Sequence, residues 1–333
     1  MDDRAAWEAV GDWYHAWFTG TVLAAVSRRG PAEAAELMFR VFRRQQKQTF
    51  LPGLAKLGID GLPPAVAAAR YHYLSNFIGG VGVEYVEESP RKAWIRYPPP
   101  RWVWPGATIC GIPSEVNAAM LRGWHANNGV MLGRLGLGFV CTGQTVDGDP
   151  GLEGYYIEHD RDLAEEERLR FAKNERMPRF DPSRAPALPA ADWPAERIAK
   201  AKRGYAMEYA RTVMQEAVAL WGADVGGRLL GAAARLVGMQ HVHATAATLQ
   251  VSDFPAFMLA MAAAEGDTAE ATPQADRSII VTRRAVPLFR GIEDPAPAMR
   301  DAWEELMVGA LAAWDRFARI ERVGPLAWRI AGG

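Results

Sequence analysis

Cysteine is scarce in this chain, which has two, Cys110 and Cys141, among 333 residues. Two thiols are too few for a disulfide framework and are typical of a reducing compartment, so the sequence predicts a cytoplasmic protein. An excess of one charge is also missing, because 38 Lys and Arg residues balance 39 Asp and Glu residues. A net charge of -1 without a long block of one sign disfavours nucleic acid and charged membrane surfaces as partners.

Long apolar runs and common catalytic motifs are missing as well. A membrane-spanning helix needs roughly 18 to 20 apolar residues, and the alanine-rich stretch 244–264 is interrupted by Asp253 and Pro255. The acidic start MDDRAAWEAVGDW does not have the pattern of a secretory signal. The sequence contains no HExxH, no GxSxG and no phosphate-binding glycine loop. We therefore expect no membrane contact, no metal and no cofactor.

What the chain does have is an internal repeat. Residues 14–30 align with 205–221, residues 43–48 with 235–240, and residues 120–123 with 306–309. The repeat predicts two copies of one fold, each long enough to bury its own core. We place the first copy at 1–160 and the second, mainly structural, copy at 197–333. A charged and then proline-rich connector, 161–196, joins them.

Hydrophobic periodicity predicts the same order of elements in both copies. In the first copy it predicts helices over 5–28, 31–51, 63–77 and 113–132, with strands in two hairpins at 82–98 and 137–160. In the second it predicts helices over 197–220, 223–250, 254–265 and 295–319, with strands near 268–273, 278–284 and 326–331. Helices packed on a small antiparallel sheet in each half give an α+β fold.

The two copies differ at one helix face. In the helix 113–132, inward positions hold His125, Asn127 and Asn128, whereas the matched positions of the second copy hold Leu311, Ala313 and Trp314. Burying imidazole and amide groups costs a few kcal/mol unless each is hydrogen-bonded. The difference predicts a polar cavity or ligand site in the first copy. The alternative is that these side chains cap neighbouring loops or bind ordered water.

Other candidate residues surround this face. A cysteine near His125 would be a candidate nucleophile, although an unpaired cysteine is commonly a small buried hydrophobic residue. Aromatic side chains would form an apolar wall, and cations would pair with a substrate carboxylate. The candidates are Cys110 and Cys141 as nucleophile, Trp102, Trp124 and Tyr71 as the apolar wall, and Arg96 and Arg122 as the cations. His72, next to Tyr71, is a candidate for the lining of the same pocket. The alternatives are that the aromatic pair around His72 packs against the sheet and that both arginines are solvated or salt-bridged.

The first copy resembles two known families. The hairpin GVEYVEESPRKAWIRYP, a helix and the segment GFVCTGQTVDGDPGLEGYYIEHD resemble the V4R-type small-ligand domain, with Cys141, Gly148-Asp149 and Tyr155-Tyr156 at its closing positions. Zinc-binding V4R domains have further cysteines, which are missing here. The helical segment AWFTGTVLAAVSRRGPAEAAELMFRVFRRQ resembles the L-2-amino-thiazoline-4-carboxylic acid hydrolase-like family. That resemblance implies hydrolytic opening of a small sulfur–nitrogen ring.

Together these observations predict a soluble, metal-independent hydrolase that acts on a carbon–nitrogen bond of a small molecule. Cys110 or Cys141 would attack, His125 would carry the proton, and Asn127 and Asn128 would hold the developing oxyanion. The alternative is a non-catalytic small-molecule-binding protein of the V4R type. The sequence leaves a homo-oligomer open.

Overall fold

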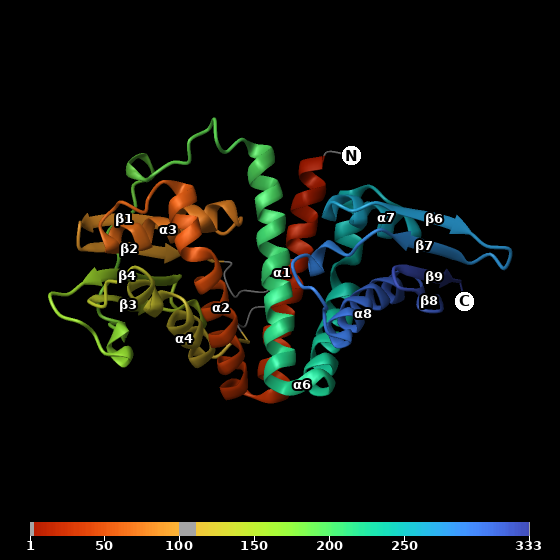
Figure 1. Cartoon of the computed structure of the whole chain (residues 1–333), viewed down its shortest axis with the longest axis horizontal. Helices are drawn as coiled ribbons and strands as arrows, with labels where there is room; N and C mark the ends of the chain where they lie inside the picture. The colour runs from red at the N-terminus through yellow and green to blue at the C-terminus, as the bar shows by residue number, and fades with distance from the viewer. Residues whose placement is uncertain (1–2, 100–110, 333) are drawn as a thin grey trace. The chain divides into compact units, whose positions relative to one another are not determined.

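The computed structural model describes residues 3–99 and 111–332 and has two compact units (Figure 1). Unit 1 combines Met1–Ala24 with Ala195–Gly333, and unit 2 is Ala25–Pro194. Each unit has helices and one small sheet, which confirms the predicted α+β class. The division differs from the predicted one, since residues up to 24 belong with the second copy and residues 161–194 belong with the first.

The first helix explains this difference. Helix α1 (Asp3–Arg29) buries its aromatic face against helices of the second copy. Tyr14 donates a hydrogen bond of 2.7 Å to Glu265, and the ring of Phe18 lies 5.0 Å from that of Tyr209. The periodicity of residues 5–28 correctly predicts an amphipathic helix, but it does not say which apolar surface covers that face.

The described part of unit 2 contains four α-helices, two hairpins and a short additional strand. Its sheet has the order β1-β2-β4-β3-β5, antiparallel throughout except for β5, which runs parallel to β3. Its elements are α2 (Pro31–Leu57), α3 (Pro64–Ile78), β1 (Glu84–Ser89), β2 (Lys92–Tyr97), α4 (Ser114–Gly123), η1 (His125–Asn127), α5 (Asn128–Met131), β3 (Leu137–Gly143), β4 (Leu152–Glu158) and β5 (Leu169–Phe171).

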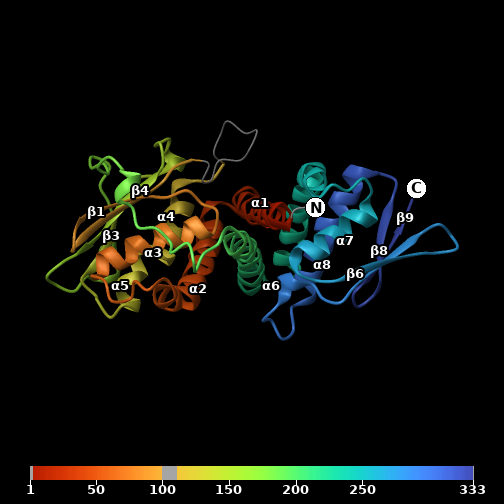
Figure 2. The same ribbon diagram turned by 90° about the horizontal axis from the view of Figure 1, so that it is seen from above.

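The sheet of unit 1 has the strand order β6-β7-β9-β8 (Figure 1). This order matches β1-β2-β4-β3 of unit 2, and β5 has no counterpart in it. Helices α7 and α8 lie on one side of this sheet (Figure 2). The long helix α6 is broken at Gly222, whose φ of 77° is left-handed, close to the predicted join between two helices. Besides α1, its elements are α6 (Ala195–Leu249), α7 (Phe254–Glu265), β6 (Ala269–Pro273), β7 (Ile279–Arg283), α8 (Pro297–Trp314), β8 (Arg319–Gly324) and β9 (Ala327–Ala331).

Matched glycines allow a close helix contact in both units. A Cβ on Gly123 of α4 would lie 2.7 Å from the carbonyl oxygen of Phe39 on α2. A Cβ on Gly309 of α8 would likewise collide with the carbonyl of Arg235 on α6. The repeat aligns these two glycines, so the same backbone approach occurs where the two copies match in sequence.

The two faces of the unit 2 sheet have different coverings. The outer face carries Trp94, Val140 and Tyr155, which pack with Met177 of the predicted connector. Glu153 fixes this segment by accepting hydrogen bonds of 2.9 Å from the backbone N–H of Met177 and from Thr142. The segment is therefore part of the packing of unit 2. The opposite face of the sheet meets α3 and the η1 turn.

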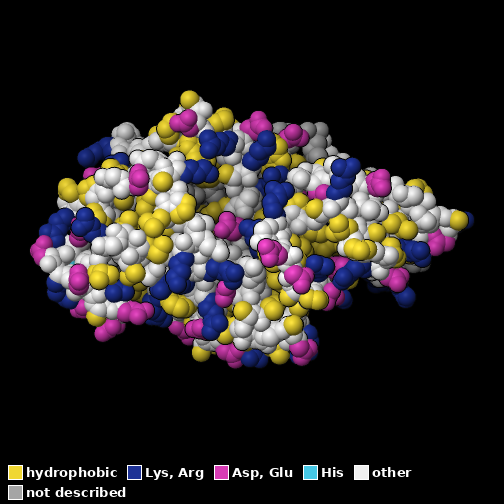
Figure 3. All heavy atoms as spheres, in the orientation of Figure 1, with side chains coloured by type: hydrophobic (Ala, Val, Ile, Leu, Met, Phe, Trp, Pro, Cys, Tyr) yellow, Lys and Arg dark blue, Asp and Glu magenta, His cyan; other side chains and the backbone are white. Residues whose placement is uncertain are grey.

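The surface carries charges of both signs. Lys and Arg side chains are interspersed with Asp and Glu side chains over the face shown in Figure 3. No single helix within residues 3–99 and 111–332 has the length and hydropathy of a membrane span, although α6 and α7, bent by 75°, pass that test as a pair.

Candidate functional site

The predicted helix 113–132 is interrupted in the structure. It consists of α4, the 3-10 turn His125–Asn127 and the short α5, whereas its counterpart α8 is continuous. The prediction of one continuous helix is therefore wrong. Arg43 donates hydrogen bonds of 2.8 Å and 3.0 Å to the carbonyls of Gly123 and Arg122. The backbone N–H of Asn127 then donates to the carbonyl of Trp124, three residues earlier, as in a 3-10 helix.

The polar residues at this break are buried and linked to α2. His125 is 4% exposed, Asn127 6% and Asn128 0%. Asn127 donates 2.9 Å to Oε1 of Gln46, and Gln46 donates 3.1 Å to Oδ1 of Asn128. The amide nitrogen of Asn128 then lies 2.9 Å from the Tyr156 hydroxyl and 3.3 Å from Nε2 of His72. The three side-chain amides therefore form a chain of hydrogen bonds that ends at the Tyr156 phenol and the His72 imidazole.

Two imidazoles and two phenols continue this chain. The rings of His72 and His125 are stacked with centroids 4.1 Å apart and planes 13° from parallel. Nδ1 of His72 lies 3.0 Å from the Tyr97 hydroxyl, and Nδ1 of His125 lies 2.7 Å from the Tyr156 hydroxyl. We call these seven residues the polar cluster: Gln46, His72, Tyr97, His125, Asn127, Asn128 and Tyr156.

The side chains of the cluster are linked by hydrogen bonds. The side-chain nitrogen of Asn128 can only donate, so the Tyr156 hydroxyl and Nε2 of His72 both face a donor. Burial raises the pKa of the Tyr156 phenol well above its ordinary value, so this phenol keeps its proton. Which atom donates in the pairs Tyr97–His72 and Tyr156–His125 depends on the imidazole tautomers.

An aromatic wall borders the polar cluster. The indole of Trp124 stacks on Tyr71 at 6.2 Å and lies 5.8 Å from the His72 ring, while Phe139 lies 4.5 Å from His125. The structure therefore brings together His125, Asn127, Asn128, Trp124, Tyr71 and His72 of the predicted site. Trp102 and Cys110 lie outside the described residues.

Two buried donors of unit 2 have no hydrogen-bond partner among the residues that the structure describes. They are the indole N–H of Trp124 in this wall, 7% exposed, and the side-chain amide of Gln45 on α2, 2% exposed. The indole N–H groups of Trp13, Trp17 and Trp303 in unit 1 likewise have no partner among the described residues.

Cys141 does not have the environment of a nucleophile. It is 1% exposed on β3, and its thiol bonds the carbonyl of Gly143 at 3.5 Å. Burial raises the pKa of the Cys141 thiol to about 12. A reactive cysteine needs the opposite shift, with a nearby cation or helix N-terminus lowering the pKa. The described geometry thus favours the small buried hydrophobic role for this residue.

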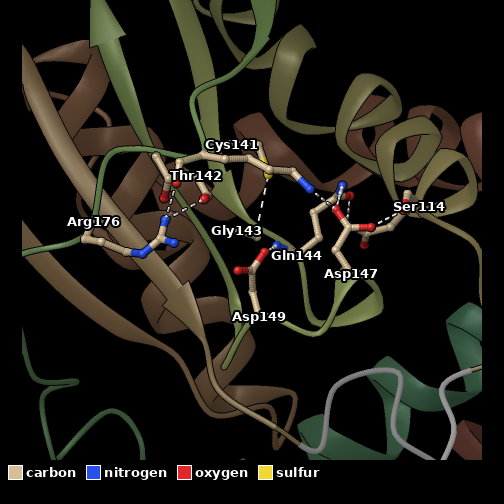
Figure 4. A network of polar contacts seen from close by, with 10 residues as sticks. Ser114, Cys141, Thr142, Gly143, Gln144, Asp147, Asp149 and Arg176 are labelled. Atoms are coloured by element: carbon tan, nitrogen blue, oxygen red, sulfur yellow. Dashed lines mark hydrogen bonds and ion pairs between the residues drawn. The ribbon is translucent and has the colours of Figure 1, made fainter.

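The polar contacts that follow Cys141 fix the β3–β4 connection (Figure 4). The backbone N–H of Gln144 donates 2.9 Å to Asp149, and its side chain accepts 2.6 Å from Asn117 of α4. Asp147 accepts from Ser114, the first residue of α4, and from Lys173. These bonds tie the hairpin to the start of α4 and explain the polar residues there without a ligand.

The two predicted cations lie away from the cluster. Arg96 pairs with Glu84 and lies 3.5 Å from Glu153, and Arg122 is exposed on α4. Because Tyr97 bonds His72, its neighbour Arg96 points to the opposite face of β2. The structure therefore gives neither cation a role in binding a carboxylate at the polar cluster.

Sequence reasoning missed three members of the cluster. Gln46 was detectable, because it interrupts the apolar stripe of α2 formed with Phe42 and Phe50. Tyr156 was not, because its neighbour Tyr155 is also aromatic and alternation along the strand does not tell which of the two faces inward. Tyr97 gave no signal either, because the sequence does not show which helix covers its face of the strand.

Unit 1 has apolar residues at the matched helix positions but a buried network elsewhere. Leu311 is 3% exposed on α8. Arg283 of β7 bonds Glu265 at 2.6 Å and Asp267 at 3.1 Å, and Glu265 also accepts from Tyr14. All the charges of this network are paired, so it is a structural ion-pair cluster. No group of three or more His, Cys, Asp or Glu residues within 3–99 and 111–332 is arranged to hold a metal ion.

No protein-family model matches the chain, and no curated protein or solved structure matches it.

Proposed function

We propose that unit 2 binds a small molecule at the polar cluster and its aromatic wall. The observation that carries this proposal is the contrast between the units. Unit 2 buries two imidazoles and three amides at a broken helix, while the matched helix of unit 1 is continuous and packs apolar residues. An apolar core suffices for packing at this place in the fold. The polar groups of unit 2 bond one another, which offsets the cost of burying them, and the role that we propose for retaining them in one copy is recognition of a ligand.

The resemblance to V4R-type domains agrees with this proposal. We infer that the two units arose from one V4R-like unit by tandem duplication, supported by the shared strand order and by the matched glycines. Unit 1 then retains the packing role, stabilised by its ion-pair cluster. The scarcity of cysteine supports placement in the cytoplasm.

Hydrolysis of a carbon–nitrogen bond is the second candidate function. The observation that favours it is the contact of 2.7 Å between Nδ1 of His125 and the Tyr156 hydroxyl, which orients the ring. In the tautomer that donates from Nδ1 to this hydroxyl, Nε2 of His125 carries the lone pair and can accept a proton from an attacking water. The reaction would then proceed by general-base catalysis, because the Cys141 thiol is not activated. Incubation with 2-amino-2-thiazoline, followed by mass spectrometry for the addition of one water, tests this alternative.

Ligand-observed nuclear magnetic resonance tests the binding proposal. A panel of single-ring compounds (phenol, indole, benzamide, benzoate and benzamidine) is screened by saturation transfer against the full chain. We expect at least one compound to bind and its signal to be lost in His125→Leu, which copies Leu311 of unit 1. The matched control is His243→Leu, which removes an exposed histidine of unit 1. Absence of binding, or equal binding to His125→Leu and the wild type, contradicts the proposal.

A further inference from the structure

We propose that the stacked imidazoles of His72 and His125 form a pH-sensitive switch, which opens unit 2 at the η1 turn when the pH falls below about 6. The proposal goes beyond the proposed function and does not depend on it. The two rings are parallel to within 13°, their centroids lie 4.1 Å apart, and both side chains are 4% exposed. Protonation of both rings would bring two buried positive charges into contact.

Repulsion limits the charge that the closed pair can carry. A like charge a few ångströms away disfavours ionisation, and burial increases the cost because little water screens the two charges. The closed pair therefore holds at most one positive charge. This limit follows from the ring positions and is the same for every choice of imidazole tautomer. In addition, Nε2 of His72 lies 3.3 Å from the side-chain nitrogen of Asn128, so a proton on Nε2 would set one donor against another.

The side chains that contact the pair are aromatic rings and amides. Asn128 of α5 contacts His72 and accepts from Gln46 of α2. The contacting rings come from α3, the end of α4, β2, β3 and β4, and are, in that order, Tyr71, Trp124, Tyr97, Phe139 and Tyr156. Three of these rings are phenols, which are uncharged in acid.

The charged side chains of α3 and of the sheet have partners away from the pair. Arg70 of α3 forms an ion pair with Glu87 at 2.8 Å. Arg96 of β2 and Glu153 of β4 lie 3.5 Å apart, on the face of the sheet opposite Tyr97. These groups therefore do not place a charge against either imidazole.

The η1 end of the pair has charged neighbours of both signs. The turn η3 (Glu165–Arg168) contacts η1, and its Arg168 and exposed Glu165 interact electrostatically with Arg43 of α2. Two cations and one exposed anion do not favour a second imidazolium.

The η1 turn is the part of this framework that separates the rings most easily. His72 lies inside the continuous helix α3, whereas His125 begins a three-residue 3-10 turn between α4 and the four-residue α5. Short 3-10 segments have poorer hydrogen-bond geometry than an α-helix. Displacement of η1 would expose His125 to water, where it can take up its proton.

The direction of the pH effect follows from the number of protons bound. In the open state both imidazoles are solvated and titrate near the ordinary histidine pKa of about 6.5. Below this pH the open state binds at least one proton more than the closed state, so opening becomes more favourable as the pH falls. One additional proton changes the opening equilibrium about tenfold per pH unit.

Hydrogen exchange of the full chain between pH 7 and pH 5 measures this effect. Protection factors of the η1, α5 and β4 amides give the opening equilibrium, with the intrinsic pH dependence of exchange divided out. We expect the opening equilibrium of unit 2 to rise at least about tenfold from pH 6 to pH 5. An equilibrium that stays constant over this range overturns the proposal.

Two variants keep a flat ring in the stack and leave a single imidazole. His72→Phe and His125→Phe should each show a rise from pH 6 to pH 5 that is about tenfold smaller than in the wild type. His159→Gln is the matched control, because it removes a histidine of unit 2 outside the stack and should keep the wild-type rise. Unit 1 is not a reference here, since burial lowers the pKa of its His241. Equal rises in the wild type and both phenylalanine variants overturn the proposal.

Nuclear magnetic resonance of the imidazole carbons tests the charge limit in the wild type, without reliance on the folding of a variant. Ring carbon shifts distinguish neutral from charged imidazoles. We expect at most one of His72 and His125 to be charged at pH 5 in molecules whose unit 2 is closed. Two charged rings in a closed and fully protected unit 2 overturn the proposal.

Discussion

Replacement of His125 by leucine separates a binding role from a packing role. In the folded protein, Nδ1 of His125 and the Tyr156 hydroxyl are hydrogen-bonded at 2.7 Å, and both side chains are buried. Leucine leaves the Tyr156 hydroxyl without this partner, which costs about 1–3 kcal/mol. Burial of the more apolar leucine side chain offsets part of this cost, at roughly 25 cal/mol per Å² of apolar surface. We expect His125→Leu to be destabilised by about 1–2 kcal/mol and to remain folded.

A double-mutant cycle with Tyr156→Phe tests the hydrogen bond directly. Phenylalanine removes the hydrogen-bond partner of His125 and also leaves one N–H of Asn128 without its partner, so this variant loses about 1–3 kcal/mol. The double variant loses the shared bond only once. Its destabilisation should therefore fall short of the sum of the single effects by about 1–2 kcal/mol.

Local hydrogen exchange is the suitable assay, because a chain with two compact units need not unfold in one step. The amides of β4 report the stability of unit 2, whereas those of β9 report unit 1 and serve as an internal reference. His243→Leu is the control variant and should stay within about 0.5 kcal/mol of the wild type. The reasoning is refuted if the two single effects add to within about 0.5 kcal/mol, or if His125→Leu raises the stability of unit 2 while ligand binding persists.

Two further predictions concern the cysteine and the ion-pair cluster of unit 1. In a Cys110→Ser variant, Cys141 is the remaining thiol; with a pKa of about 12 its thiolate fraction at pH 8 is only about one in ten thousand. Iodoacetamide at pH 8 should therefore modify it only after denaturation, as intact mass measures, and rapid native modification would restore the thiolate mechanism. Replacement of Arg283 by methionine leaves Glu265 and Asp267 unpaired in the core and should cost unit 1 about 3–5 kcal/mol in the same exchange assay. Arg228→Met breaks an exposed pair and should cost less than about 1 kcal/mol, so equal losses would contradict the structural role of the cluster.

Helices and strands were predictable where hydrophobic periodicity and flanking proline or glycine residues determine them. Proline and glycine mark the starts and ends of α2, α3 and α7, and the periodicity between them gives the correct element type. The domain boundary was not predictable, because a helix such as α1 shows only that it has an apolar face. Tyr14 shows the limit clearly, since its partner Glu265 is 251 residues away.

The candidate site shows the same limit at the level of single side chains. Comparison of the copies singled out His125, Asn127 and Asn128, because a packing face that is apolar in one copy has no need of polar groups in the other. The same comparison could not reveal the interruption of the helix at Trp124. At that point Arg43 of α2 donates hydrogen bonds to the backbone carbonyls of Arg122 and Gly123. The comparison does offer Gln45, which is buried where its aligned residue Val237 packs an apolar side chain. A polar residue buried in one copy where the other copy packs an apolar one is therefore the signal that the repeat supplies. The contacts between helices, such as those of Arg43, are what the repeat leaves out.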